Sequence, residues 1–124
     1  MAYNNILGQA ETYIAGADLS AKQFLFVVSG GDEVTVTGAG EAATGVLWNA
    51  PVSGDAATVI RGGEPNVYVG TGGLTVGDEV AADANGKAVA AASTDVILGI
   101  ARTTTAAGGL ATISFYGPAQ SVKA

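Results

Sequence analysis

Hydrophobic residues in this chain occur in short runs that Gly, Asp, Asn or Ser interrupts every few positions. Runs of this kind, rich in Val, Ile, Thr, Phe and Tyr, are typical of β-strands joined by tight turns. The alanine-rich stretch Ala88–Ala92 lacks a helix cap and an apolar stripe at helical spacing, so we interpret it as strand as well. We therefore expect an all-β fold. The predicted strands are Lys22–Val28, Glu33–Thr37, Gly45–Trp48, Ala56–Arg61, Asn66–Val69, Asp78–Ala82, Lys87–Ala91, Val96–Arg102 and Leu110–Tyr116.

Two of the predicted turns indicate hairpins. The sequence Ser29-Gly30-Gly31-Asp32 can hold positive φ angles and separates the first two predicted strands. Between Val80 and Val89, the pair Asn85-Gly86 favours a type I′ turn. Both signals predict short antiparallel strands.

The chain also contains a weak internal repeat at an offset of 54 residues. Gly45 and Gly54 are nine positions apart, as are Gly99 and Gly108, and each pair brackets a similar apolar segment. The repeat predicts a small β-barrel or sandwich built from two similar halves. These halves comprise about residues 18–60 and 73–114. The alternative interpretation is a chance resemblance between strands of similar length.

Composition limits the core and the partners of this domain. With 19 glycines and 6% aromatic residues in 124, the core must be assembled from small and β-branched side chains. Eleven Asp and Glu residues against five Lys and Arg residues give a net charge of −6, so we expect no nucleic acid partner. Cysteine is absent, which excludes disulfides, thiol nucleophiles and cysteine metal sites.

The hydropathy of the chain predicts no targeting or membrane segment. Residues 1–5 lack the basic and apolar stretches of a signal peptide. No window approaches the run of about 18 apolar residues that a membrane helix needs. We therefore expect a protein that is made and kept soluble in a cytoplasm, with no membrane partner.

The candidate catalytic and metal-binding motifs do not meet the requirements of their chemistry. Histidine is absent, which removes the most common general base and metal ligand. Adjacent carboxylates at Asp32-Glu33 and at Asp78-Glu79 would point to opposite faces of a strand, so neither pair converges on one bond. Asp83-Ala84-Asn85-Gly86 lacks two ligands of a calcium loop, and Gly38–Ala43 does not open a helix as a dinucleotide fingerprint must. We expect no enzyme activity and no cofactor.

The candidate interface residues are mostly in the first seventeen positions. We expect residues 18–124 to form a single β domain. Residues 1–17 mix apolar and polar side chains without strict alternation, which suits either an arm that pairs with a partner or a first strand added to that domain. Trp48 ends a predicted strand just before a turn, so it is a candidate for an interface anchor or for a core side chain. The candidate interface residues are Tyr3, Ile6, Leu7, Tyr13 and Trp48.

Several turn and strand motifs carry a family resemblance. They are Ala17–Phe24, Gly38–Leu47, Leu74–Val80, Asp83–Ala88, and Leu98–Ala101 followed by Gly108 and a final apolar strand. Together they resemble the small capsid cement, or head decoration, proteins of tailed bacteriophages, over about residues 2–116. Because these motifs are turn patterns and not catalytic signatures, no catalytic residue is transferred from that family.

The resemblance implies a β-rich virion protein, often a homotrimer, on the outer surface of the capsid. Such a protein binds at junctions between major capsid subunits and stabilises the shell against internal DNA pressure, so its partners are the major capsid protein and copies of itself. A small core gains apolar contact area in an oligomer, and many copies bind a lattice by multivalency. The alternatives are another phage structural module, such as a tail or fibre domain, and a carbohydrate-binding β domain using Trp48, Tyr68 and Tyr116.

Overall fold

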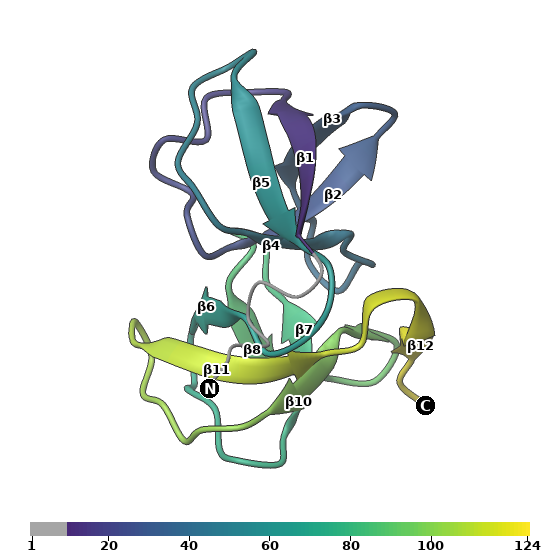
Figure 1. Ribbon diagram of the computed structural model, residues 1–124. Coiled ribbons are helices and arrows are strands. Elements are labelled where there is room, and N and C mark those ends of the chain that lie inside the picture. The colour runs from purple at the N-terminus through teal and green to yellow at the C-terminus, as the bar shows by residue number, and fades with distance from the viewer. Residues whose placement is uncertain (1–9) are drawn as a thin grey trace.

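The strands of this protein form two β-units that pack against each other (Figure 1). The structure, a computed structural model, describes residues 10–124. It contains no α-helix in this range, which confirms the predicted all-β class. The elements are β1 (Ala10–Ala15), β2 (Phe26–Gly30), β3 (Glu33–Val36), β4 (Gly45–Leu47), β5 (Ala56–Ile60), β6 (Asn66–Tyr68), β7 (Glu79–Ala82), β8 (Ala88–Ala90), β9 (Val96–Ile97), β10 (Gly99–Ala101), β11 (Leu110–Phe115), the 3₁₀ helix η2 (Gly117–Ala119) and β12 (Ser121–Val122).

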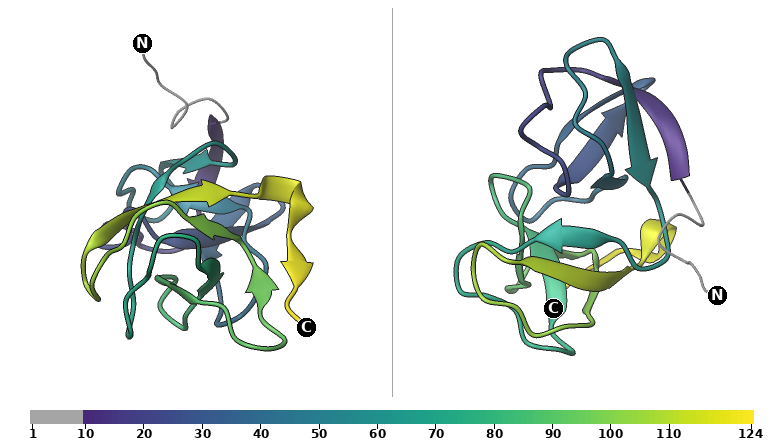
Figure 2. Two further views of the ribbon diagram at one scale, coloured as in Figure 1. Left: turned by 90° about the horizontal axis from the view of Figure 1, so that it is seen from below. Right: turned by 60° about the vertical axis from the view of Figure 1, so that its left-hand side comes forward.

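The first unit is a closed barrel and the second is a sheet that almost closes. The barrel has the strand order β1-β3-β2-β4-β5, and β1 closes it by pairing antiparallel with β5 and parallel with β3. The second sheet has the order β6-β11-β10-β7-β8, and one parallel bridge between Val69 and Ala88 joins its two edges. Figure 2 shows this arrangement from two further directions, with β12 at the side of the second unit.

The two units repeat one pairing pattern at the predicted offset of 54 residues. Corresponding pairs are Val46–Ile60 in the first unit and Ile100–Ser114 in the second, and Ala15–Val34 in the first and Val69–Ala88 in the second. The predicted duplication is therefore confirmed. The copies are longer than the predicted halves, because β1 and β6 are corresponding strands and both lie before the predicted starting points.

Two glycines explain why the repeat left a signal in the sequence. Gly45 and Gly99 are corresponding residues on β4 and β10, at places where the neighbouring strand leaves no room for a side chain. A Cβ on Gly45 would lie well inside the contact distance of the Ile60 carbonyl oxygen, and a Cβ on Gly99 would meet the Ser114 carbonyl oxygen in the same way. Glycine is thus required at both places by close approach of two backbones.

The units are joined by a short segment of the first that is inserted into the second. Tyr68 N–H donates to the carbonyl of Phe24 (3.0 Å), and Phe26 N–H donates to the carbonyl of Gly86 (2.8 Å). The residue that corresponds to Tyr68 in the first unit is Ile14, and its N–H bonds within its own unit. Residues 24–26 therefore lie between β6 and the β7–β8 hairpin of the second unit. In the first unit, the hydrogen bond from Ile14 to Asp32 closes the corresponding gap.

The hydrophobic core follows this insertion. One cluster fills the first barrel around Leu19, Leu47 and Val59, all of which are buried. The second cluster fills the second unit and includes Phe26, whose ring is fully buried and stacks on Phe115 with centroids 6.2 Å apart. Because a side chain of the first unit lies in the core of the second, the two units pack as one body.

The structure corrects the predicted limits of two strands. The strand predicted from Lys22 begins only at Phe26, because Phe24 has a φ angle of 65° that interrupts the extended backbone. The single strand predicted at Val96–Arg102 is divided into β9 and β10 at Leu98. The division occurs because β9 pairs with β12, whereas β10 pairs with β7 and β11.

The hairpin between β7 and β8 also differs from the prediction. A type I′ turn requires positive φ at both central residues, but of Asn85 and Gly86 only Gly86 has one, at 78°. Asp83 N–H donates to the Lys87 carbonyl (2.8 Å), which leaves a three-residue loop closed by a glycine. The Asp83 carboxylate stabilises this loop by accepting N–H groups from Asn85 and Lys87 at 2.8 and 2.9 Å.

Candidate functional site

Three aromatic side chains meet at the surface where the two units join. We call Phe24, Trp48 and Tyr68 the aromatic cluster. The Phe24 ring lies edge-on to Trp48, with centroids 5.7 Å apart and planes at 75°, and its centroid is 6.0 Å from that of Tyr68. Tyr68 is 38% exposed, and the other two are half-buried. The cluster therefore presents a partly exposed aromatic surface built from both units.

Phe24 takes part in this cluster at a cost in backbone energy. Its φ of 65° is in the left-handed region, which costs an L-residue roughly 1–2 kcal/mol. Strands β2 and β7 correspond at an offset of 53 residues, one fewer than the rest of the repeat, because Val27 pairs with Val36 as Val80 pairs with Ala90. The residue that corresponds to Phe24 is therefore Gly77, with φ of 92°, which adopts this region freely. The correspondence is supported by hydrogen bonds of 2.8 Å from Phe24 N–H to Leu47 and from Gly77 N–H to Ala101. Contacts of the Phe24 ring with Trp48 and Tyr68 offset the cost.

A depression of about 300 Å³ adjoins the exposed side of Tyr68. Its lining combines an aromatic residue, two aliphatic residues, a glutamine, a lysine and a glycine. Gln23 Nε2 donates to the carbonyl of Trp48 (2.8 Å), which orients the amide. Lys87 makes no ion pair within residues 10–124. The lining residues are Ala21, Gln23, Leu25, Tyr68, Lys87 and Gly108.

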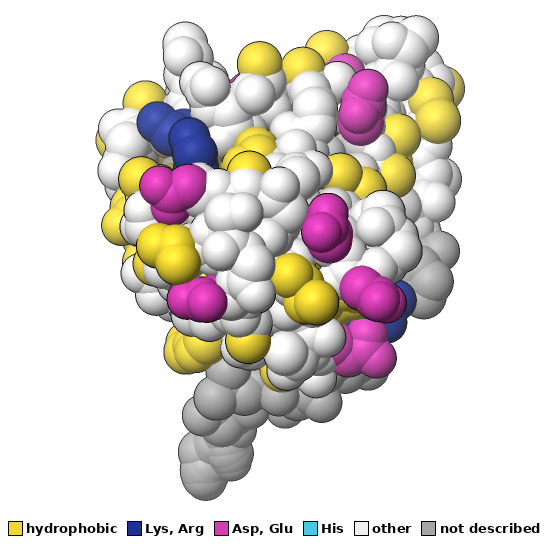
Figure 3. Space-filling model, turned by 90° about the horizontal axis from the view of Figure 1, so that it is seen from above, with side chains coloured by type: hydrophobic (Ala, Val, Ile, Leu, Met, Phe, Trp, Pro, Cys, Tyr) yellow, Lys and Arg dark blue, Asp and Glu magenta, His cyan; other side chains and the backbone are white. Residues whose placement is uncertain are grey.

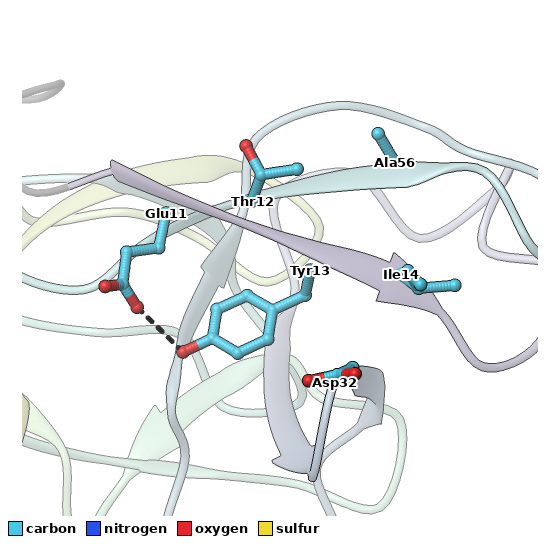
Figure 4. Close-up of a pocket in the computed structure, with 6 residues that line it drawn as sticks. All are labelled: Glu11, Thr12, Tyr13, Ile14, Asp32 and Ala56. Atoms are coloured by element: carbon cyan, nitrogen blue, oxygen red, sulfur yellow. Dashed lines mark hydrogen bonds between the residues drawn. The ribbon is translucent and has the colours of Figure 1, made fainter.

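A second surface lies along β1 and is open to solvent (Figure 4). Tyr13 Oη donates to Glu11 Oε1 (3.0 Å), and Arg61 Nη1 lies 2.6 Å from the same oxygen. The hydrogen bond from Arg61, followed by that from Tyr13, lowers the pKa of Glu11. Burial, and then the hydrogen bond to Glu11, raises the pKa of Tyr13. Glu11 thus accepts hydrogen bonds from both groups, whereas Arg61 Nε is buried and has no hydrogen-bond partner within the described residues. The depression on this surface has a volume of about 480 Å³ and is lined by Glu11, Thr12, Tyr13, Ile14, Asp32 and Ala56.

The structure separates the residues that the sequence marked as interface candidates. Tyr13 lies on β1 and packs against the core of the first barrel, whereas Trp48 lies in the aromatic cluster. Tyr3, Ile6 and Leu7 lie outside the described residues.

Of the aromatic residues considered for carbohydrate binding, Trp48 and Tyr68 come together through Phe24. Tyr116 lies past the opposite end of β11, because Tyr68 pairs with Leu110 at its start. Sequence reasoning placed Phe24 inside a strand and missed its role.

Of the two acidic pairs in the sequence, Asp78-Glu79 makes contacts that hold local structure. Asp78 Oδ2 accepts the N–H of Thr75 (2.9 Å), and Glu79 forms an ion pair with Lys123. Within residues 10–124 there is no group of three or more His, Cys, Asp or Glu side chains that could hold a metal ion. No helix in this part of the chain is long and apolar enough to cross a membrane. The face shown in Figure 3 carries more acidic than basic side chains, scattered among small hydrophobic patches.

Comparisons with known proteins identify a similar fold. No family model matches this chain, and no curated protein sequence matches it. Among solved structures, the chain is similar to the N base of the head fibre gp8.5 of bacteriophage phi29, with a TM-score of 0.68 and 22% sequence identity. The similarity covers 86% of this chain and 92% of that chain. The two proteins therefore share a fold over nearly the whole of the phi29 domain.

Proposed function

We propose that this protein is a non-enzymatic structural component of a bacteriophage virion that binds the outer surface of the capsid and stabilises it. The observation that carries the proposal is the similarity to the phi29 head fibre base, which includes 92% of that domain at a TM-score of 0.68. Fold alone does not define function. Here, however, the shared fold and the motif resemblance to capsid cement proteins favour the same part of a virion.

The physical properties of the chain suit attachment to a capsid. A net charge of −6 opposes nonspecific binding to packaged DNA. Phe26 buries its ring in the second unit, and residues 24–26 share backbone hydrogen bonds with that unit. These contacts oppose bending at the junction of the two units. Such stiffness is what a protein needs to hold neighbouring capsid subunits together.

Binding to isolated heads tests the proposal. Purified protein would be mixed with phage heads that lack it, and the heads would be sedimented and then heated while DNA release is followed. We expect saturable co-sedimentation and a higher temperature of DNA release. An unrelated acidic protein of similar mass serves as the control for nonspecific adsorption. Absence of binding to heads would overturn the proposal.

The phi29 similarity favours a second candidate function, which is the base of a head fibre. A fibre base must bind the head but need not stabilise the shell. Saturable binding without a change in the temperature of DNA release would therefore favour this candidate over a cement protein. Antibody-labelled electron microscopy of virions gives an independent result, because label on the tail would contradict both.

The proposal includes a homotrimer on the capsid. A monomer has a mass of 12.1 kDa, so native mass spectrometry of the trimer should give three times this value, about 36 kDa. Detection of trimers on solubilised heads would support this stoichiometry even if the free protein is monomeric. A stoichiometry other than three on the head would overturn it.

A further inference from the structure

We propose that the depression beside the aromatic cluster binds an acidic saccharide residue, with its ring against Tyr68 and its carboxylate on Lys87. The inference does not rest on the proposed capsid role. It rests on three residues that line one depression: Tyr68 with a partly exposed ring, Gln23 with an oriented amide, and Lys87, which has no ion-pair partner within residues 10–124.

The aromatic ring supplies the apolar contact. One face of a pyranose ring presents C–H groups, which pack on an aromatic side chain and are removed from water there. Tyr68 is 38% exposed and packs against Phe24, with ring centroids 6.0 Å apart and planes at 56°. Phe24 is in turn held against Trp48. The ring that would contact the sugar is therefore fixed before binding, which reduces the entropy cost of binding.

Gln23 supplies directed hydrogen bonds for hydroxyl groups. A glutamine amide has two N–H donors and one carbonyl acceptor. One N–H of Gln23 donates to the Trp48 carbonyl at 2.8 Å, and within the described residues its other groups make no hydrogen bond. The bond to Trp48 orients the amide, and it leaves a donor and an acceptor for adjacent sugar hydroxyls.

Lys87 supplies the charge that selects an acidic sugar. Three of the five basic residues form ion pairs: Arg61 with Glu11, Arg102 with Glu64, and Lys123 with Glu79. Lys87 lines the depression and has no such partner in the part of the chain that the structure describes. The carboxylate of Asp83, which lies in the same loop, accepts two backbone N–H groups instead. A ligand carboxylate would complete the charge balance at this point.

The size of the depression favours a sugar over a protein partner. Its volume of about 300 Å³ is at the lower end of small-molecule sites, which span roughly 300–1,000 Å³. A stable protein interface buries at least about 1,000 Å² and usually has a continuous apolar centre. Here the apolar part of the lining consists of Ala21, Leu25 and Tyr68, and Gln23 and Lys87 complete it with polar residues.

A titration with defined oligosaccharides tests the inference. Acidic probes would be hexagalacturonate and a hyaluronan hexasaccharide, and the neutral probe would be maltohexaose. Because Trp48 is the only tryptophan and contacts Phe24, its fluorescence reports on the cluster, and calorimetry gives binding without relying on it. We expect binding of at least one acidic probe that weakens as salt is added, and weaker or no binding of the neutral one.

Matched variants assign the binding to this depression. We expect Tyr68→Ala and Lys87→Met each to weaken binding of the acidic probe by about tenfold, the equivalent of about 1.4 kcal/mol. The controls are Tyr116→Ala, which removes another exposed tyrosine, and Lys123→Met, which removes a basic residue that pairs with Glu79 and is outside the lining. Both should bind as the unmodified protein does, and thermal unfolding would verify that all four variants are folded.

Three outcomes would overturn the inference. They are no calorimetric binding of either acidic probe, equal affinity for the neutral probe, and binding that is unaffected by Tyr68→Ala and Lys87→Met. The same variants tested for head binding separate the two proposals. If the Tyr68→Ala variant does not bind heads and the unmodified protein binds no saccharide, this surface contacts the capsid and the saccharide assignment is wrong.

Discussion

Replacing Gly45 or Gly99 with alanine should destabilise this protein strongly and by similar amounts. Each glycine lies on a strand whose neighbour passes close to its Cα. An added Cβ on Gly45 would meet the Ile60 carbonyl oxygen and would lie 2.6 Å from Val59 Cγ1. An added Cβ on Gly99 would meet the Ser114 carbonyl oxygen and would lie 3.2 Å from Phe115 Cα. Ordinary contacts of a Cβ are 3.4–4 Å.

The magnitude follows from what must move. The obstructing atoms are mainly backbone, so the clash cannot be relieved by rotating a side chain, and the paired strands must separate locally. Forcing extra atoms into a packed interior costs about 1–3 kcal/mol, and each weakened ladder hydrogen bond adds about 1 kcal/mol. We therefore expect each substitution to lower the free energy of unfolding by about 3 kcal/mol or more. For a chain of this size that lowers the unfolding temperature by roughly 10 °C.

Thermal and urea unfolding followed by circular dichroism would measure the effect. Gly30→Ala is the matched control, because a Cβ there has no atom within 4 Å and φ is not positive. Its free energy of unfolding should change by no more than about 0.5 kcal/mol. If Gly45→Ala unfolds at the same temperature as Gly30→Ala, the close approach of β4 and β5 is wrong. If only one of the two strand glycines tolerates alanine, the correspondence between the units fails.

Two further predictions concern backbone strain and acid stability. Thr94 has φ of 74°, and the corresponding residue of the first unit is Gly40, with φ of 68°. Thr94→Gly should therefore raise the free energy of unfolding, measured in urea, by about 0.5–1 kcal/mol. A decrease would contradict backbone strain at Thr94. The pKa of Glu11 lies below its ordinary value of 4.5 because Arg61 and Tyr13 donate hydrogen bonds to the carboxylate. The ionised Glu11 therefore contributes fully to stability above about pH 4.5, and this contribution is lost as the pH falls through the lowered pKa of the folded protein. Glu11→Gln should therefore show a smaller loss of stability than the unmodified protein between about pH 5 and pH 3, and equal losses would exclude this role.

The fold was predictable where local chemistry decides it. The apolar runs located the strands from β2 to β11, but not β1 or β12. The two glycine pairs gave the 54-residue offset, because only glycine fits where Gly45 and Gly99 approach their neighbours. The correspondence of β1 and β6 left no such signal. Tyr13 corresponds to Val67, because Tyr13 pairs with Ala57 as Val67 pairs with Ala111. The two strands therefore share their pairing but not their residue types.

The candidate site was not predictable because remote residues determine it. Nothing near Phe24 in the sequence favours a positive φ. Its conformation is fixed by Leu47, which accepts its N–H, and by Tyr68, which donates to its carbonyl. Sequence patterns report local periodicity and turn chemistry, whereas these contacts join segments 23 and 44 residues apart. Lys87 likewise came to the site through the loop that Asp83 holds, and not through any motif.

The aromatic cluster follows from a difference between the two copies in their backbone hydrogen bonds. In the first unit, Ile14 N–H bonds to Asp32 and the barrel closes on itself. In the second unit, the corresponding donor Tyr68 bonds to Phe24, so residues 24–26 enter between the strands. That insertion places Phe26 in the core of the second unit and leaves the Phe24 ring between Trp48 and Tyr68 at the surface. The same asymmetry therefore joins the units and creates the depression, and neither unit alone contains the residues for either.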